Sequence, residues 1–520
     1  MMKKNVLLWA ALALGMCLGT WGHAFAQDAR FDVLEYRVEG TTLLPAALVE
    51  KAVYPYLGEK KTLADVENAR EALEKAYADI GYLTVLVNLP PQNASTGVIR
   101  LQVNEAPVDR LRVVESRYFS LGQIKAGVPE LAEGNVPNFN QMQDELAALN
   151  RSGDRRITPV LRPGKTPGTV EVDLKVQDTL PLHGYAELSS RYSESTIPAR
   201  VNAGLRWENL WGQQHTIGID VQTIPGRPNG GNSLTVSYGV PLQSGDFVSA
   251  YGIKSDANSD FGLIGLVAKS QVYGIRYLAP LPARGNLRHT AIFGVDYKDI
   301  NQSITLADAG GFDTPIVYAP FTLGWDGTWQ GEGRSSRVAL AFNFHARVMP
   351  GSEQQFADKR FKGKPGYSYL RGTLSHEETL ATNWGLSARA TWQYTEEPLI
   401  SDEQFSIGGA DTVRGYLQGA AAGDTGIALT LEATTPNFGK GYSESLEELR
   451  MVVFADSGSV RVIQPLTAAG HFSFSGVGVG LRLKAWRSAR AAFDWAVAMD
   501  DVGNTKRGDS RLMFNLRYDW

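Results

Sequence analysis

Cysteine is almost absent from this chain of 520 residues, which contains only Cys17. That residue lies in the segment predicted below to be cleaved on export, so the mature protein is expected to lack thiols. A lone cysteine excludes a disulfide scaffold and a cysteine-based metal site. Long apolar runs are also missing, because no stretch after residue 26 approaches the roughly 20 apolar residues of a spanning helix. The net charge of -4 offers no basic surface for nucleic acid.

The N-terminus has the pattern of a secretory signal peptide. Lys3 and Lys4 precede an apolar run from Val6 to about Gly19, and Ala24-Phe25-Ala26 supplies small residues at a cleavage site. We therefore predict that residues 1–26 are removed during export. An exported chain without a spanning helix is soluble in the periplasm, secreted, or a β-barrel of the outer membrane.

The C-terminus favours the barrel. Leu512, Phe514, Leu516, Tyr518 and Trp520 alternate with polar residues, which is the period of a strand with one apolar and one wet face. Ten such residues alone would also suit a soluble sandwich. The pattern recurs through the C-terminal two-thirds of the chain, however, and a membrane barrel produces that repetition because outward residues meet lipid and inward residues meet water. Residues 181–520 are predicted to form a transmembrane β-barrel of about sixteen antiparallel strands.

Nine strands of this barrel stand out by alternation. They are predicted at Val201–Trp207, Ile217–Val221, Leu234–Val240, Phe247–Ile253, Tyr273–Tyr277, Ala291–Tyr297, Val338–Val348, Ile427–Ala433 and Leu449–Ala455. The longest connection, about residues 396–424, is long enough to be functional in its own right. A strand number near sixteen predicts an aqueous lumen in place of a packed core.

The region before the barrel has a different pattern. Residues 27–107 read as strand, two helices and two strands, with Thr62 and Asp65 forming a capping box at the start of the second helix. Residues 108–180 repeat the same order. We predict two small α+β domains, although propensity alone does not distinguish one family of such domains from another.

No enzyme chemistry is predicted. His376-Glu377 lacks the second histidine of a zinc protease, and Gly476 to Gly480 lacks the strand-turn-helix context of a dinucleotide fingerprint. No catalytic residue, metal site or cofactor is assigned. An outer-membrane lipase with a Ser/His pair stays open as an alternative, since such a pair can form across strands.

Several segments resemble the two-partner secretion transporter (TpsB) family, the haemolysin activation/secretion type of outer-membrane protein with POTRA domains. These segments are Gly81-Tyr82, Leu89 to Asn93, Gly97 to Val103 with Glu105, Leu149-Asn150, Leu161 to Gly164, Gly408 to Tyr416, and Val453 to Gly458. The first five resemble two POTRA domains. The run Val413-Arg414-Gly415-Tyr416 matches the VRGY loop motif, which the wider barrel-inserting superfamily shares, and the segment through Phe454, Asp456 and Gly458 resembles the strand that receives this loop.

The resemblance implies a pore in the outer membrane of a Gram-negative bacterium, with its N-terminal domains in the periplasm. Such a pore exports a large unfolded partner of the haemolysin, adhesin or toxin type, and the barrel-assembly machinery and outer-membrane lipid would be its other partners. A barrel-assembly factor is the main alternative, and a diffusion porin is a weaker one. Family members commonly carry a pore-plugging N-terminal helix. Only about four residues separate the signal from Phe31, so no such plug is expected here.

The alternation around Phe454 suggests how the loop is held. It places Arg450, Val452, Phe454 and Asp456 on one face of a strand, so Asp456 faces the lumen. A loop folded inward would bring Arg414 to that carboxylate, which accepts a guanidinium through two parallel hydrogen bonds. The alternative is that Arg414 lies on a solvated loop and Asp456 merely lines the pore. Tyr416 is expected to pack near Phe454.

Overall fold

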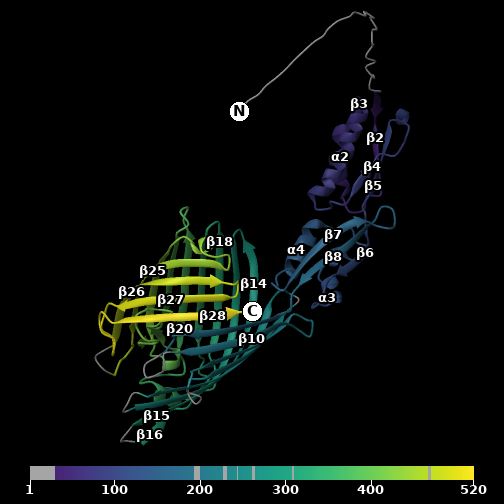
Figure 1. The fold of residues 1–520 in the computed structure, drawn as a ribbon. Helices are drawn as coiled ribbons and strands as arrows, with labels where there is room; N and C mark the ends of the chain where they lie inside the picture. The colour runs from purple at the N-terminus through teal and green to yellow at the C-terminus, as the bar shows by residue number, and fades with distance from the viewer. Residues whose placement is uncertain are drawn as a thin grey trace, which may run out of the picture. The chain divides into compact units, whose positions relative to one another are not determined.

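The computed structural model describes residues 30–192, 199–226, 231–242, 244–260, 264–306, 310–466 and 470–520. The signal peptide predicted for residues 1–26 lies outside these ranges. The chain divides into two compact units that meet between Thr179 and Leu180. Figure 1 shows helices with short strands in the first unit and long strands in the second.

The first unit begins with a module around a three-stranded sheet of order β2-β5-β4. Its elements are β1 (Phe31–Val33), β2 (Glu35–Glu39), α1 (Ala46–Val53), η1 (Tyr54–Tyr56), β3 (Gly58–Lys61), α2 (Leu63–Asp79), β4 (Leu86–Asn88), η2 (Ala94–Thr96) and β5 (Val98–Asn104). The capping box of Thr62 and Asp65 is present at the start of α2. This helix buries Val66, Ala69, Leu73 and Tyr77 against the module's core. The short pair β1-β3 is an addition that the sequence pattern did not indicate.

A second module follows with the same order of helices and strands. It consists of β6 (Val108–Val114), α3 (Leu121–Ala126), η3 (Pro129–Leu131), α4 (Phe139–Leu149), β7 (Arg155–Pro163) and β8 (Val170–Asp178). The sheet order is β6-β8-β7, with β6 parallel to β8 as β2 is parallel to β5. Each module therefore has its own sheet and its own buried apolar cluster.

The second unit is a closed antiparallel barrel. Its sixteen full-length strands within the described ranges are β9 (Leu182–Ser189), β10 (Arg200–Leu210), β11 (His215–Thr223), β12 (Ser233–Pro241), β13 (Phe247–Asp260), β14 (Ile264–Arg284), β15 (Leu287–Leu306), β18 (Phe321–Gly331), β19 (Arg334–Phe344), β20 (Ser368–Thr379), β21 (Gly385–Tyr394), β24 (Thr425–Thr434), β25 (Leu446–Arg461), β26 (His471–Ala485), β27 (Ala489–Ala498) and β28 (Ser510–Asp519). The short strands β16 (Gly310–Asp313) and β17 (Ile316–Tyr318) also pair with β15, next to β18. Pairing of β28 with β9 closes the ring. The predicted fold class is confirmed.

The two faces of the wall follow the predicted alternation. On β25, Met451 and Val453 are exposed on the outside, whereas Val452, Phe454 and Asp456 are buried on the luminal side. A large outward side chain is stable there because it meets hydrocarbon and not water. One predicted strand is wrong in extent: Val338–Val348 ends at Phe344 in the structure, where β19 gives way to a loop.

The connections differ at the two ends of the barrel. Short turns join β10 to β11, β18 to β19 and β26 to β27, whereas the connections from β19 to β20, β21 to β24 and β27 to β28, at the other end, are longer. Exposed tryptophans stand at the short-turn end, including Trp211, Trp384, Trp486 and Trp520. Amphipathic indole rings are typical of the interface between a membrane and water. Among the described helices, none is both long and apolar enough to cross a membrane.

Candidate functional site

The long connection between β21 and β24 turns back into the barrel. Its strands β22 (Phe405–Ile407) and β23 (Ala421–Gly423) pair as a small hairpin. The hairpin packs on the inner faces of β24, β25 and β26 through a buried apolar cluster: Phe405, Ile407, Val413, Tyr416, Ala421, Ala428, Val460, Phe474 and Ala498. The segment predicted as a functional loop is therefore an ordered insert in the lumen.

Arg414 of this insert is bonded to the barrel wall. Its Nε and NH2 groups donate to the two oxygens of Asp456 at 2.7 and 2.9 Å, and its backbone N–H donates to the same carboxylate at 3.1 Å. Both residues are only 3% exposed. The structure thus brings together the two charges that the strand pattern placed on one face, in the two-pronged geometry that only arginine offers.

The Phe454 ring lies beneath this guanidinium. The Arg414 Cζ atom is 3.4 Å from the ring centroid, which places the cation on the negative face of the ring. Phe454 and Asp456 are two residues apart on β25 and so point into the lumen together. The strand therefore offers the arginine a flat support and a paired acceptor.

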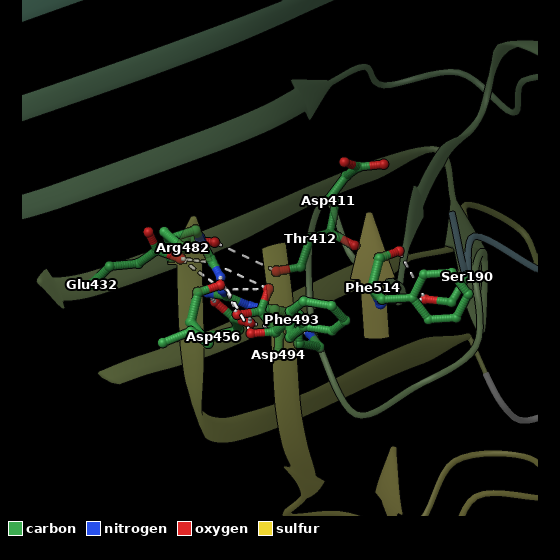
Figure 2. Close-up of polar contacts among 12 residues, drawn as sticks. Ser190, Asp411, Thr412, Glu432, Asp456, Arg482, Phe493, Asp494 and Phe514 are labelled. Carbon is green, nitrogen blue, oxygen red and sulfur yellow. Dashed lines mark hydrogen bonds and ion pairs between the residues drawn. The ribbon is translucent and has the colours of Figure 1, made fainter. Parts of the chain in front are cut away.

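Three further charged residues complete the site and were not predicted. Arg414 NH1 donates to Glu432 on β24 at 2.6 Å and lies 3.7 Å from Asp494 on β27. Arg482 on β26 forms a two-pronged pair with Asp494 at 2.7 and 3.1 Å. Figure 2 shows Glu432, Asp456, Arg482 and Asp494 gathered at one place on the barrel wall. We call these five residues the luminal clamp.

The missed residues carried a weak signal. Glu432 alternates with the exposed, lipid-facing Leu431, and Asp494 alternates with the exposed Trp495, so each could have been placed in the lumen by parity. Which luminal charges stand opposite one another depends on the register of strands far apart in sequence. That register cannot be read from the pattern of one strand.

Glycines give the loop room to lie directly on the wall. A Cβ atom on Gly458 would come within 2.8 Å of Val413 Cγ2, and one on Gly476 would come within 2.0 Å of the Arg414 carbonyl oxygen. Gly415 has a φ of 97°, a conformation that a side chain disfavours, and lies against the backbone of Ala498. The Val413 to Tyr416 motif thus packs directly against the backbone of the barrel wall at glycine positions.

Tyr416 contacts a different aromatic residue from the one expected. Its ring packs against Phe474 with centroids 4.4 Å apart, and the predicted partner, Phe454, instead supports Arg414. The Tyr416 hydroxyl lies 2.9 and 3.0 Å from the carbonyl oxygens of Ser475 and Asp500, and it accepts from the Asp500 N–H. A fully buried phenol is satisfied in this way, which fixes the end of the motif to β26 and to the loop after β27.

The tip of the insert also touches both terminal strands of the barrel. Arg511 on β28 donates to the Gly415 carbonyl oxygen at 3.1 Å and to the Tyr192 hydroxyl at 3.1 Å. Arg191, just after β9, donates to Asp411 at 2.8 Å. The loop therefore spans the seam at which the barrel closes.

Two family models match the chain. The model for the ShlB-type POTRA domain matches residues 31–106, and the model for the haemolysin secretion/activation protein ShlB/FhaC/HecB matches residues 322–483. The second match includes Val413 to Tyr416 as well as Asp456. The first match therefore falls on the first module, and the second covers the luminal clamp except for Asp494.

The curated relatives have low sequence identity to this chain, but the matches extend over most of its length. The chain is 20% identical over 393 residues to the heme/hemopexin transporter protein HuxB of Haemophilus influenzae strain 86-028NP, covering 72% of this chain and 67% of HuxB. It is 22% identical over 445 residues to the outer membrane transporter CdiB of Escherichia coli O6:K15:H31, covering 82% of this chain and 72% of CdiB.

Solved structures share the fold. CdiB from Escherichia coli superposes with a TM-score of 0.67 at 18% identity, covering 97% of this chain and 93% of that one. BamA from Haemophilus ducreyi lacking POTRA domains 1–3 gives 0.59 at 14% identity, covering 95% and 100%. Since a BamA barrel is similar as well, the family rests on the sequence models and not on shape. Two segments of the chain, residues 31–106 and 322–483, match models of the two-partner secretion transporter (TpsB) family, whose members export partner proteins across the outer membrane, and the N-terminal unit lies in the periplasm.

Proposed function

We propose that this protein exports one large partner exoprotein, of the haemolysin, adhesin or toxin type, and that it performs no enzymatic step itself. The observation that carries the proposal is the buried pair of Arg414 and Asp456, inside a barrel preceded by a ShlB-type POTRA domain. The relatives are named as a heme/hemopexin transporter and as outer membrane transporters, which fits a protein cargo of this class.

The chain divides, in this proposal, into a signal peptide at 1–26, POTRA domains at 27–107 and 108–180, and the barrel at 181–520. The repeated element order supports a POTRA assignment for the second domain. The barrel-assembly machinery would insert the barrel, and outer-membrane lipid would surround it.

Cargo recognition is assigned to sheet edges of the N-terminal unit. Strands β2 and β4 are the edges of the first sheet, and β6 and β7 are those of the second. On β4 the Val87 N–H already bonds to Glu74, and β7 carries Pro159 and Pro163, which have no N–H to give. On β6 the Leu111 N–H likewise bonds to Glu133, and Val108 bonds to the backbone of Gly134 and Asn135. The edge of β2 is therefore better suited to pair with an extended segment of unfolded cargo.

The luminal clamp would hold the insert in its resting position during this process. Two guanidinium groups face three carboxylates in a space from which water is largely excluded, so the insert is fixed by charge and geometry together. Movement of the insert would then be the step that admits cargo.

A comparison of the culture medium with and without this protein tests the proposal. We expect one large protein to disappear from the medium of the deletion strain, while other outer-membrane barrels keep their normal abundance. A general loss of barrels would favour a barrel-assembly factor. An unchanged medium with reduced uptake of small solutes would favour a diffusion porin, and loss of a lipid-hydrolysing activity would favour a lipase.

A further inference from the structure

The insert has a second set of anchors, separate from the luminal clamp. They lie at its two ends, at Leu399–Gln404 with the short helix η4 (Ser401–Glu403), and at Asp424, where the chain re-enters the wall. Two buried carboxylates, Glu403 and Asp424, form the centres of these anchors. Neither belongs to the motif that the sequence indicated.

Glu403 is held by side chains of the barrel wall. Its Oε1 accepts hydrogen bonds from Lys298 Nζ on β15 at 2.6 Å and from the Tyr318 hydroxyl on β17 at 2.7 Å. Its Oε2 accepts from the Tyr369 hydroxyl on β20 at 2.7 Å. With 2% of its surface exposed, this carboxylate has exchanged water for one cation and two phenols.

Asp424 joins three loops at one carboxylate. Its Oδ1 accepts from the Leu399 N–H at 2.8 Å and from Gln404 Nε2 at 3.0 Å, which ties the beginning of the insert to its end. Its Oδ2 accepts from the Ile463 N–H at 2.6 Å, in the loop after β25, and contacts Arg360 at 3.4 Å. Asp424 is fully buried.

Helix α5 (Glu353–Lys359) belongs to the same assembly. Arg360, which follows it, also donates to the Ile463 carbonyl oxygen at 2.8 Å. Phe356 of the helix is buried in an aromatic cluster beside the insert. The cluster contains Ile300, Ile316, Tyr318, Phe356, Tyr367, Tyr369, Leu399 and Ile400. We call residues Leu399–Gln404 together with α5 the exit lid.

The exit lid lies on the luminal side of the wall, at the end opposite the short turns. Lys298 shares a face of β15 with the buried Asp296, and Tyr369 lies on the face of β20 opposite the exposed Leu374. The loops that it joins connect β15 to β18, β19 to β20, β21 to β24 and β25 to β26. Because the N-terminal unit is periplasmic, these are the loops of the extracellular mouth.

We propose that Glu403 and Asp424 are positioning residues that latch the exit lid over the extracellular mouth of the pore, and that the lid must be displaced for cargo to leave. The inference rests on the proposed function in assuming that cargo passes through this lumen. Buried carboxylates suit a latch because each bond is strong while the lid is seated. Water and the freed donors satisfy one another once the lid moves.

Channel recording on the full-length protein in planar bilayers tests the latch. The variants Glu403→Gln and Asp424→Asn keep the shape of each side chain and remove its charge. We expect each to raise the fraction of time spent conducting by about tenfold or more, because a weakened charged hydrogen bond shifts a two-state equilibrium by that factor.

The matched control is Asp326→Asn. Asp326 pairs with Arg337 between β18 and β19, so this variant removes one luminal charge without touching the lid. It should conduct like the wild type. If Glu403→Gln and Asp424→Asn also record like the wild type, or if the control is equally leaky, the latch is rejected. Should either carboxylate variant fail to give a heat-modifiable barrel, Gln404→Ala loosens the same lid and leaves both carboxylates in place.

A second measurement asks whether the lid moves. In the variant Lys298→Cys/Glu403→Cys, bridging the two thiols with a short bis-maleimide should silence the leaky channel and stop export. Normal export by the bridged protein would overturn the proposal. Conductance requires no cargo, so leaky lid variants in a protein that exports nothing would reject the proposed function and not the latch.

Discussion

Arg414 is almost completely buried, and it makes four hydrogen bonds to two carboxylates and lies over an aromatic ring. Breaking a buried pair from one side costs about 3–5 kcal/mol, because the remaining charge stays desolvated. The asymmetry within the luminal clamp matters here. Without Arg414, three carboxylates would share one space with Arg482 alone, whereas without Glu432 the pair with Asp456 survives.

At this scale we expect Arg414→Ala to reduce export at least as strongly as any other single change in the luminal clamp. Glu432→Gln should cost much less. Arg414→Lys should rescue poorly, since an ammonium lacks the two-pronged geometry. The measurement is cargo in the medium, normalised to folded barrel by heat-modifiable gel mobility. Asp456→Ala combined with Arg414→Ala should be no worse than the single changes, because contacting residues do not act additively. Losses that simply add would contradict the pairing.

A glycine supplies an independent prediction about the same loop. In Gly476→Ala the new methyl group would clash with the Arg414 carbonyl oxygen, so the loop would have to move away from the barrel wall. Overpacking of this kind costs about 1–3 kcal/mol, and we expect faster trypsin cleavage in the loop together with reduced export. Gly252→Ala is the matched control, because its methyl group would only reach ordinary contact with Tyr273 at 3.4 Å. Equal protease resistance of the two variants would show that the close contact at Gly476 is not needed.

At the scale of elements, alternation and helix caps were enough to place most strands and helices. The error at the end of β19 is instructive. The predicted strand ran on through His345 to Val348, because these residues keep the alternation, yet His345 leaves the wall to stack on Tyr367 at 13° and to bond to Pro350. The alternation of a strand does not reveal that one of its side chains instead packs against a neighbouring loop.

The luminal contacts show the same limit. Asp456 could be assigned to the lumen from its neighbours on β25, but its partner Arg414 comes from a loop about forty residues away, and the other carboxylates near Arg414 come from two further strands. Glu403 and Asp424 lie in the long connection that was predicted to be functional, but no pattern singled out either residue, since neither a period of two nor a period of 3.6 applies there. The alternation along a strand predicts which face a charged residue occupies, but its contact partners depend on the tertiary structure.

Glu105 provides a pH test for the first module. It accepts hydrogen bonds from the Thr42 and Leu43 backbones and from the Tyr77 hydroxyl. Burial alone would raise the pKa of this carboxyl, but the bonds from Thr42 and Leu43 outweigh it and lower the pKa. For Tyr77, burial is the main cause that raises the pKa to about 12, so its hydroxyl stays protonated at neutral pH.

A carboxyl with a lowered folded-state pKa contributes stability that is present above its unfolded value, near 4.5, and is lost as the pH falls through the folded value. We therefore expect the melting temperature of the isolated N-terminal unit to drop between pH 6 and pH 3, and to drop less in Glu105→Gln. Glu59→Gln, at an exposed residue of β3, is the control and should keep the full drop. If the melting temperatures of Glu105→Gln and the wild type fall equally with pH, Glu105 does not cause the acid destabilisation.

At the scale of the whole molecule, the two units are built so that damage to one should leave the other folded and functional. The barrel closes by pairing β28 with β9, both within the second unit, and each N-terminal module has its own apolar cluster. Neither unit therefore needs the other to complete a sheet. Cargo selection is assigned to the first unit and passage to the second, so loss of one function should leave the other measurable.

Deletion of residues 27–179 should leave a barrel that is inserted, heat-modifiable and as quiet in planar bilayers as the full-length protein, because the luminal clamp and the exit lid lie wholly in the second unit. Export should be lost. The isolated N-terminal unit, produced in the periplasm beside the wild-type transporter, should in turn reduce export by competing for the cargo's extended segment through β2. A matched periplasmic protein without free sheet edges is the control. If the isolated unit binds random denatured chains as well as the cargo, or if the deleted barrel still exports it, the selecting element lies elsewhere in the chain.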